Sequence, residues 1–306
     1  MTNEFIKIKG SIRQRGFNLK KAAALSLICL MFFLSACKGG VSEFEETREI
    51  TVISREDGSG TRGAFTELFG VYTNMEGHGK VDATTEEAII TNNTAVMLYC
   101  VSTNPYAIGY ISLGSMSDVV KSANVDGVAA SLENVKNGTY KASRPFYIVT
   151  TQSLSAPAKD FISFILSDGG QEVVESAGYV PALAGREYTP SVDSGKVVVG
   201  GSSSVTPVME KLKEAYGAYN PGIDVEVQQS DSTTGVSSTL QGICDIGMSS
   251  RALTENEKHS GALAETIALD GIVIIVNSIN PNDDFTSEQI KGIFLGETAY
   301  WDSLEK

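Results

Sequence analysis

Short apolar runs rich in β-branched residues alternate with helical patterns along most of this 306-residue chain. A strand that is buried on both faces of a parallel sheet reads as a continuous apolar run, and each parallel connection needs a crossover, usually a helix. The alternation therefore predicts an α/β fold with mixed, mostly parallel sheets. The runs expected to form strands are residues 50–53, 108–111, 146–150, 196–199, 225–228, 243–248 and 272–276.

Between these runs, apolar residues recur every three or four positions, a spacing that predicts amphipathic helices. We expect such helices at residues 64–69, 161–166 and 208–216. The Asp-Gly-Gly sequence at 168–170 predicts a helix stop after the second of them. Glycine and proline cluster at 178–195, which predicts a long connection.

The composition excludes several classes of protein. With 42% hydrophobic and 20% charged residues the chain can bury a core, so disorder and fibrous repeats are ruled out. The formal net charge is -13, and we expect no nucleic-acid partner, because an acidic surface cannot neutralise phosphates. His78 and His259 are the only histidines. A histidine cluster is therefore excluded, and no metal site is expected.

The N-terminal residues have the pattern of an export signal. Six basic residues and one acidic residue precede an apolar run at 22–34. This run is too short to span a bilayer, because spanning needs roughly 20 apolar residues. Leu-Ser-Ala-Cys at 34–37 resembles the lipobox of bacterial lipoproteins, in which Cys37 would be diacylated; an ordinary cleaved signal is the alternative. We expect residues 1–36 to be removed and 37–46 to tether an extracytoplasmic, membrane-anchored protein.

Removal of the signal would take away six of the 24 basic and one of the 37 acidic residues, leaving a net charge of -18. It would also remove Cys29. Because Cys37 would be lipidated, only Cys100 and Cys244 would remain as thiols, and their apolar surroundings favour free, buried side chains. A disulfide between them is the alternative in an exported protein.

Three loops rich in Ser, Thr and Gly each lie between an expected strand and an expected helix, at residues 54–61, 200–207 and 230–236. A helix N-terminus presents unpaired N–H groups and a partial positive charge, and hydroxyls add donors without adding charge. Any one such loop is explained as a simple N-cap. Three together predict a site for an oxyanion.

Arg55 is the only cation within these loops, and its planar fork suits two oxygens of a tetrahedral anion. The alternative for Arg55 is a surface salt bridge with Glu56 or Asp57. Asp57 would either hold Arg55 or accept a proton from the anion. A monohydrogen phosphate can donate that proton, whereas fully ionised sulfate would be repelled, so the pair favours phosphate.

No catalytic constellation accompanies the loops. No lysine follows Gly60 or Gly235, as a phosphate-binding P-loop requires. Ser59 as a hydrolase nucleophile would need a base, and none is evident. We therefore expect a binding protein with no cofactor rather than an enzyme. A phosphate-ester hydrolase is the alternative from another class.

The motifs resemble those of the PstS family, the phosphate-binding lipoproteins of ABC phosphate importers, which are type II periplasmic-binding proteins. One half of the family pattern is found at residues 54–65, 108–114, 144–146 and 178–181, and the other at 201–205, 245–251, 270–271, 293–296 and Trp301. The resemblance covers nearly all of residues 50–306. It implies a two-lobed fold and a monomer that binds inorganic phosphate and delivers it to ABC permease subunits.

The two halves stand in the opposite order to that of the family, so the chain resembles a circular permutant. The resemblance then implies a continuous lobe at 139–270 and a second lobe formed by 47–138 together with 271–306. Surface loops near joined termini tolerate such cuts. The alternative is a truncated or mis-joined tandem gene.

Ligand positions carry over from the family motifs onto all three loops. The implied phosphate-binding residues are Arg55, Asp57, Ser59, Gly60, Thr61, Ser204, Val205, Ser232 and Ser250. Ser250 stands where some members have an Asp that accepts the phosphate proton, which leaves that role to Asp57 or to the Ser250 oxygen. Arg251 is a possible second cation, or else a surface or hinge residue. The alternatives are a receptor for sulfate or molybdate and a non-transport phosphate sensor.

Overall fold

The computed structural model describes residues 44–75, 79–182 and 185–304. The predicted signal and Cys37 lie outside the described residues. In the first part of the chain the elements are β1 (Thr51–Arg55), α2 (Gly60–Phe69), β2 (Tyr72–Met75), β3 (Gly79–Asp82), β4 (Ile89–Thr91), α3 (Thr94–Thr103), β5 (Ala107–Ser112), β6 (Lys121–Val125), α4 (Leu132–Lys136) and β7 (Ser143–Thr150). They are followed by α5 (Ala156–Ile165), α6 (Asp168–Ser176), β8 (Val180–Pro181), β9 (Gly195–Ser202), α7 (Thr206–Tyr219), β10 (Ile223–Ser230), α8 (Ser232–Leu240), β11 (Ile246–Ser249), α9 (Glu255–His259), β12 (Leu263–Val276), β13 (Asp284–Phe285) and α10 (Ser287–Phe294).

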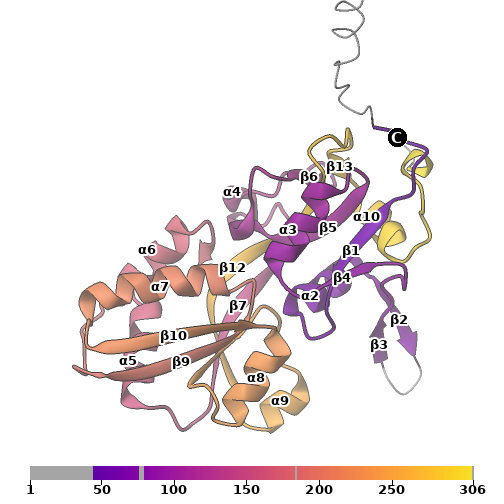
Figure 1. The fold of residues 1–306 in the computed structure, drawn as a ribbon. Helices are drawn as coiled ribbons and strands as arrows, with labels where there is room; N and C mark the ends of the chain where they lie inside the picture. Colours follow the sequence, from indigo (N-terminus) through magenta and orange to yellow (C-terminus); the bar gives the residue numbers. More distant parts are fainter. Residues whose placement is uncertain (1–43, 76–78, 183–184, 305–306) are drawn as a thin grey trace, which may run out of the picture. The chain divides into compact units, whose positions relative to one another are not determined.

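Most of the described strands form one mixed sheet with the order β10-β9-β11-β7-β12-β5-β1-β4 (Figure 1). The outer strands pair in parallel. Strands β10 and β11 each pair with β9, and strands β4 and β5 each pair with β1. The central strands β7 and β12 pair antiparallel. The long β12 pairs with β7 through Leu263–Gly271 and with β5 from Ile272 onward, so it connects the two ends of the sheet. The predicted mixed α/β fold is confirmed, but the sheet is not mostly parallel, because the pairings around β7 and β12 are antiparallel.

Two large hydrophobic cores lie at the two ends of this sheet. The first contains only residues between Phe146 and Ala268, and it packs α5, α6 and α7 against β9 and β10. The second is built from residues up to Ala142 and from Ile272 onward, together with Val180. We call β9, β10, β11 and the first core the β9 half, and β1, β4, β5 and the second core the β1 half.

All seven predicted strands are present. The predicted helix stop at 168–170 is wrong: α5 already ends at Ile165, and these residues form the first turn of α6, capped by the Ser167 hydroxyl. Gly170 is needed inside that turn because a Cβ there would meet the backbone carbonyl of Phe164. The glycines therefore allow two helices to follow each other closely rather than ending the helical region.

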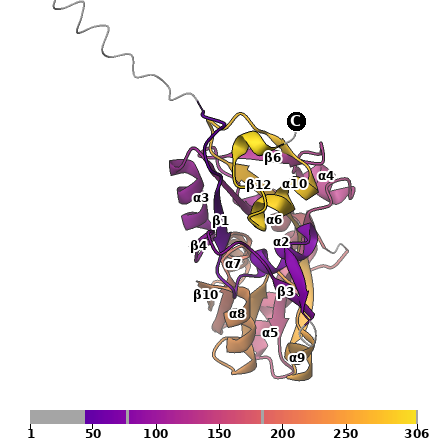
Figure 2. The same ribbon diagram turned by 90° about the vertical axis from the view of Figure 1, so that its right-hand side faces the viewer.

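The segment that leads into β1 lies beside the last described residues (Figure 2). Ile50 N donates to Ala299 O at 2.8 Å, and Trp301 N donates to Arg48 O at 3.3 Å. A short surface connection would therefore be enough to join these two segments. Among the described residues, no helix combines the length and the apolar character needed to cross a membrane.

Cys100 and Cys244 are both free thiols in the structure. Cys244 is buried, as expected, whereas Cys100 is only partly buried and packs against a smaller core that contains Met97 and Val101. Burial raises the pKa of the Cys244 thiol, which keeps it protonated and unreactive.

Candidate functional site

The three predicted loops come together where β1, β9 and β10 end and α2, α7 and α8 begin. Ser59 caps α2, Val205 is the N-cap of α7, and Asp231 caps α8. The carboxyl ends of parallel strands are where α/β proteins bind ligands, and helix N-termini concentrate N–H donors there. Two of these helices belong to the β9 half and one to the β1 half.

A buried cluster of hydroxyl groups lies between these helix ends. Thr61 Oγ1 and Ser204 Oγ are 2.6 Å apart, and they join α2 to the loop before α7. Ser202 Oγ donates to Ser250 Oγ at 3.0 Å, and Ser232 Oγ lies 3.3 Å from the same atom. All five side chains are at most 2% exposed. We call these five residues the hydroxyl cluster.

Gly60 allows α2 to approach the cluster. A Cβ at this position would collide with Ser232 Oγ and would lie 2.6 Å from Ser250 Oγ. Any side chain at Gly60 would therefore separate the N-terminus of α2 from the β9 half. Gly60 and Thr61, both predicted as ligand positions, thus lie directly against the predicted positions Ser204, Ser232 and Ser250.

Arg55 is buried beside the cluster, with 3% of its surface exposed. Its Nη2 donates to Ser203 Oγ at 3.0 Å, which links it across to the loop before α7. Arg55 Nε and Nη2 also donate to the Glu56 carboxylate, at 2.8 and 2.7 Å. The side chain of Asp57 is 96% exposed and pairs instead with Arg62 at 2.8 Å. The structure therefore places Glu56, and not Asp57, against Arg55.

The two remaining predicted positions have structural contacts. Ser59 Oγ accepts the Arg62 N–H at 3.3 Å and so caps α2. Val205 is fully buried in the first core, and its N–H donates to Ser202 O at 3.0 Å. Both hold the helix ends that face the cluster.

Sequence reasoning missed a buried ion pair next to the cluster. Arg144 in β7 donates to Asp270 Oδ2 in β12 through Nε and Nη2, at 3.2 and 3.1 Å. Its Nη1 donates to Ser250 O at 3.3 Å, which ties the pair to the cluster. Asp270 Oδ1 accepts from Ser112 Oγ and the Leu113 N–H. Both residues lie in segments that resemble the family motifs, 144–146 and 270–271, but nothing in the sequence indicates that they pair with each other.

Burial raises the pKa of Asp270 to about 6, although Arg144 and the Ser112 hydroxyl oppose the shift. Asp270 is therefore ionised at neutral pH, and Arg144 has its counter-ion. Because both charges are almost fully buried, removal of either one would leave the other uncompensated.

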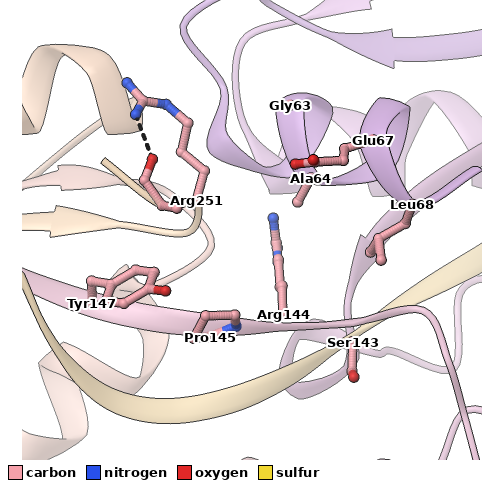
Figure 3. Close-up of a pocket in the computed structure, with 10 residues that line it drawn as sticks. Gly63, Ala64, Glu67, Leu68, Ser143, Arg144, Pro145, Tyr147 and Arg251 are labelled. Carbon is pink, nitrogen blue, oxygen red and sulfur yellow. Dashed lines mark hydrogen bonds between the residues drawn. The ribbon is translucent and has the colours of Figure 1, made fainter. Parts of the chain in front are cut away.

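A cavity of about 310 Å³ adjoins this ion pair (Figure 3). It is lined by Gly63, Ala64, Glu67 and Leu68 from α2, by Ser143, Arg144, Pro145 and Tyr147 from β7, and by Arg251 and Ala252. Figure 3 shows Arg144 rising from β7 toward α2. Arg251 lines this cavity rather than the hydroxyl cluster, and it forms an ion pair of 2.8 Å with Glu257.

The site contains donors rather than metal ligands. Within 44–75, 79–182 and 185–304, no group of three or more His, Cys, Asp or Glu side chains could hold a metal ion. The cluster contributes hydroxyls and helix N-termini, and Arg55 adds one buried cation. Such a set can bind an anion without any covalent step.

Comparison with known proteins gives consistent findings. A family model described as a PBP superfamily domain matches residues 42–169 and 187–305. Phosphate-binding protein PstS 2 of Streptococcus agalactiae is 48% identical over 294 residues, which covers 94% of this chain and 100% of the relative. The crystal structure of a phosphate-binding protein of a phosphate ABC transporter from Streptococcus pneumoniae TIGR4 is 42% identical, with a TM-score of 0.65, and covers 84% of this chain and 100% of that chain.

A more distant relative matches only in part. Phosphate-binding protein PstS of Bacillus subtilis is 28% identical over 136 residues, which is 44% of this chain and 42% of the relative. This alignment covers less than half of each chain. The alignment with the Streptococcus agalactiae relative runs over the whole relative, so that protein has the same order as this chain.

Proposed function

Because this chain belongs to the PstS family of phosphate-binding proteins, we propose that it binds inorganic phosphate outside the cytoplasm and delivers it to an ABC importer. The observation that carries this proposal is the meeting of three helix N-termini and Arg55 around the hydroxyl cluster. The relatives are named as binding proteins of transporters, and the chain is not an enzyme.

An entering phosphate replaces weak bonds by stronger ones. In the cluster, the neutral hydroxyls of Thr61 and Ser204 bond to each other. Hydrogen bonds to an ionised oxygen are shorter and roughly twice as strong as neutral ones. The exchange favours the anion even though the exported chain would have a net charge of -18, because local dipoles and Arg55 act at contact distance.

The proton of a monohydrogen phosphate needs an acceptor, and we assign this role to Ser250 Oγ. Ser250 is fully buried in the cluster and already accepts from Ser202, whereas the Asp57 carboxylate is exposed and pairs with Arg62. A hydroxyl does not repel sulfate as a carboxylate would. We therefore expect weaker discrimination between phosphate and sulfate than an Asp at this position would give.

We further propose that the β1 half and the β9 half are the two lobes that close over the anion, with boundaries near residues 139 and 270. The two separate cores support this division. The ligand positions are divided between the halves, so neither alone completes the site. Closure around a ligand by hinge motion is the expected movement.

The circularly permuted order is supported by two observations. Residues 46–50 lie against residues 299–302, so a short surface connection is enough to restore the family order. The hydroxyl cluster also unites residues from both halves of one chain. If the two parts of the sequence came from different gene copies, we would not expect their residues to assemble one site.

Export and anchoring complete the proposal. Residues 1–36 would be removed as a signal, and Cys37 would carry the lipid. The lipobox-like sequence at 34–37 supports this. Cys37→Ala should move the protein from the membrane fraction to the soluble extracytoplasmic fraction. If the variant stays in the membrane fraction, the anchor assignment is wrong.

The proposal is tested by calorimetric titration of the exported chain from Lys38 onward with phosphate, with sulfate titrated in parallel. We expect one phosphate per chain. Arg55→Ala should weaken binding by at least about 100-fold, because it removes the buried cation. Arg186→Ala deletes an exposed arginine in the β8–β9 connection and serves as the matched control. Equal affinity of the Arg55 and Arg186 variants would overturn the site.

A further inference from the structure

A second contact between the two halves lies at the exposed rim of the site, outside the hydroxyl cluster. The backbone oxygen of Gly58, in the loop after β1, accepts two bonds from Thr233 in the first turn of α8. The Thr233 N–H and its Oγ1 each lie 3.3 Å from this oxygen. No predicted phosphate ligand takes part in this contact.

Arg251 fixes the Thr233 hydroxyl from the other side. Its Nη2 donates to Thr233 Oγ1 at 3.0 Å, so the Thr233 hydroxyl hydrogen is left to point at Gly58. Arg251 is itself held by both oxygens of Glu257, at 2.8 and 2.9 Å, and by Ala252 O. With all these bonds made, Arg251 positions Thr233 and does not reach the anion site.

Glu257 is rigid in turn. It is the N3 residue of the capping box of α9, and its Oε2 accepts the Thr254 N–H at 2.7 Å. Burial acts to raise its pKa, but the bonds from Arg251 and Thr254 outweigh burial and lower the pKa. Glu257 therefore keeps its charge over the whole neutral range, and the chain from Glu257 through Arg251 to Thr233 stays intact.

Gly58 permits this contact because it has no side chain. A Cβ there would collide with Asp231 Oδ1 and would lie 2.7 Å from Asp231 Cγ. Asp231 cannot easily move, because it caps α8 through the Thr234 N–H at 2.9 Å and the Thr234 hydroxyl at 2.6 Å. The collision arises only when the two halves are together.

We propose that Thr233, positioned by Arg251 and Glu257, forms a latch on Gly58 that holds the two halves closed and slows release of the bound anion. The latch rests on the proposed function, since it deepens how that site retains its ligand. Thr233 and Gly58 are positioning residues and do not contact the anion. The latch therefore acts on the dissociation rate, whereas the cluster and Arg55 provide the binding energy.

The first test measures phosphate dissociation from the full chain by rapid filtration with labelled phosphate. Thr233→Val should raise the dissociation rate about 3- to 10-fold, the range for one hydrogen bond exposed to water, with the association rate nearly unchanged. Thr233→Ser keeps the hydroxyl and should restore the rate. Thr103→Val removes a hydroxyl that bonds within α3 and is the matched control. An unchanged dissociation rate in Thr233→Val would overturn the latch.

Two further variants test the geometry of the latch. Arg251→Gln should raise the dissociation rate in the same range, and adding Thr233→Val to it should have little further effect, because both act through one bond. Gly58→Ala should weaken affinity most, since it blocks the approach to Asp231. Gly217→Ala, in α7 with open space around it, is its control. Additive effects of the Thr233 and Arg251 changes would contradict the proposed relay.

A measurement without phosphate separates the two hypotheses. Spin labels at exposed Tyr99 in the β1 half and Ile243 in the β9 half, with the native cysteines replaced, report the distance between the halves. Thr233→Val should broaden this distance distribution toward longer values. If the unaltered chain binds no phosphate in calorimetry, the proposed function fails, and the distance distribution still decides the latch. An unchanged distribution would overturn the latch even when phosphate binds.

Discussion

Two buried polar regions of this molecule use the same kinds of donor in opposite ways. In the β9 half, the Asp160 carboxylate is 1% exposed and is surrounded by donors. Tyr188, Tyr216 and Asn220 donate to it at 2.6, 2.7 and 2.9 Å, and Ser191 donates through its N–H and its hydroxyl. In the hydroxyl cluster, comparable donors converge but no carboxylate is among its members.

A structural anion and an anion-binding site differ in where the negative charge comes from. Within the described part of the chain, no Lys or Arg donates a hydrogen bond to Asp160, so hydroxyl, amide and backbone donors are its direct support. Burial acts to raise its pKa, but the bonds from Ser191, Tyr188 and Tyr216 outweigh burial and lower the pKa to about 2. The chain thus already stabilises one buried anion with donors like those of the cluster. The cluster supplies the same kind of environment to an anion from solution.

The largest expected effect comes from removing the internal anion. Asp160→Ala leaves five donor groups without their acceptor and should lower the free energy of unfolding by about 4 kcal/mol. Phosphate affinity should change little, because Asp160 bonds to Tyr216 in the first core and, among the residues that the structure describes, to none of the site loops. Chemical denaturation and calorimetry on the same variant measure both quantities. A large loss of affinity with unchanged stability would show that Asp160 supports phosphate binding rather than the fold.

Gly60→Ala should have the opposite profile. The new methyl group would meet Ser232 Oγ and Ser250 Oγ and keep α2 away from the cluster. We expect affinity to fall about 100-fold, equivalent to about 2.7 kcal/mol, while the free energy of unfolding changes by less than about 1 kcal/mol. Gly217→Ala again provides the control. Wild-type affinity in Gly60→Ala would mean that the anion does not need the α2 terminus.

Sequence predicts the location of these loops well because strand, glycine-rich turn and helix signals coincide there. Among the strands that it missed, β4 has only three residues, and Ile89 and Ile90 are about half exposed, so they give no buried pattern. The prediction of 272–276 found only the apolar end of β12, because its first residues alternate with polar ones on an exposed surface.

Sequence could not identify the partners of the charged residues. Glu56 and Asp57 are neighbours, and only the direction of the backbone after β1 decides that Glu56 meets Arg55 while Asp57 faces solvent. Arg144 and Asp270 are 126 residues apart and meet because β7 and β12 pair in a register that places them opposite each other. Local sequence patterns indicate neither the Glu56–Arg55 contact nor the Arg144–Asp270 pair. A buried pair of this kind is found only once the register is known.

The next effect is the dependence of the free energy of unfolding on pH. Asp160 has its pKa lowered from about 3.8 to about 2, so it adds stability above pH 4 that is lost as the pH falls toward 2. Two pKa units correspond to about 2.7 kcal/mol. In Asp160→Asn this contribution is absent at all pH values. The difference in unfolding free energy between wild type and variant should therefore shrink as the pH falls from 4 to 2, as measured by urea unfolding at each pH. A constant difference would show that the folded chain does not lower the pKa of Asp160.

The smallest effect tests whether the cluster can be made to resemble the Asp160 site by receiving a carboxylate of its own. Ser250→Asp places an acceptor where the proposed phosphate proton would lie. A fully ionised sulfate would then face a negative charge, whereas monohydrogen phosphate can donate its proton to it. We expect sulfate binding to weaken about 10-fold relative to phosphate, equivalent to about 1.4 kcal/mol.

Ser250→Asn is the matched control for this change, because it has the same shape without the charge. Competition titrations of both variants with the two anions at neutral pH measure the ratio of affinities. If Asn and Asp shift the ratio equally, volume rather than charge sets the selectivity, and Ser250 is not the proton acceptor. If only Asp shifts it, the neutral Ser250 is what leaves the natural site open to both anions, and a carboxylate in the site, unlike Asp160 in the β9 half, would restrict it to an anion that can donate a proton.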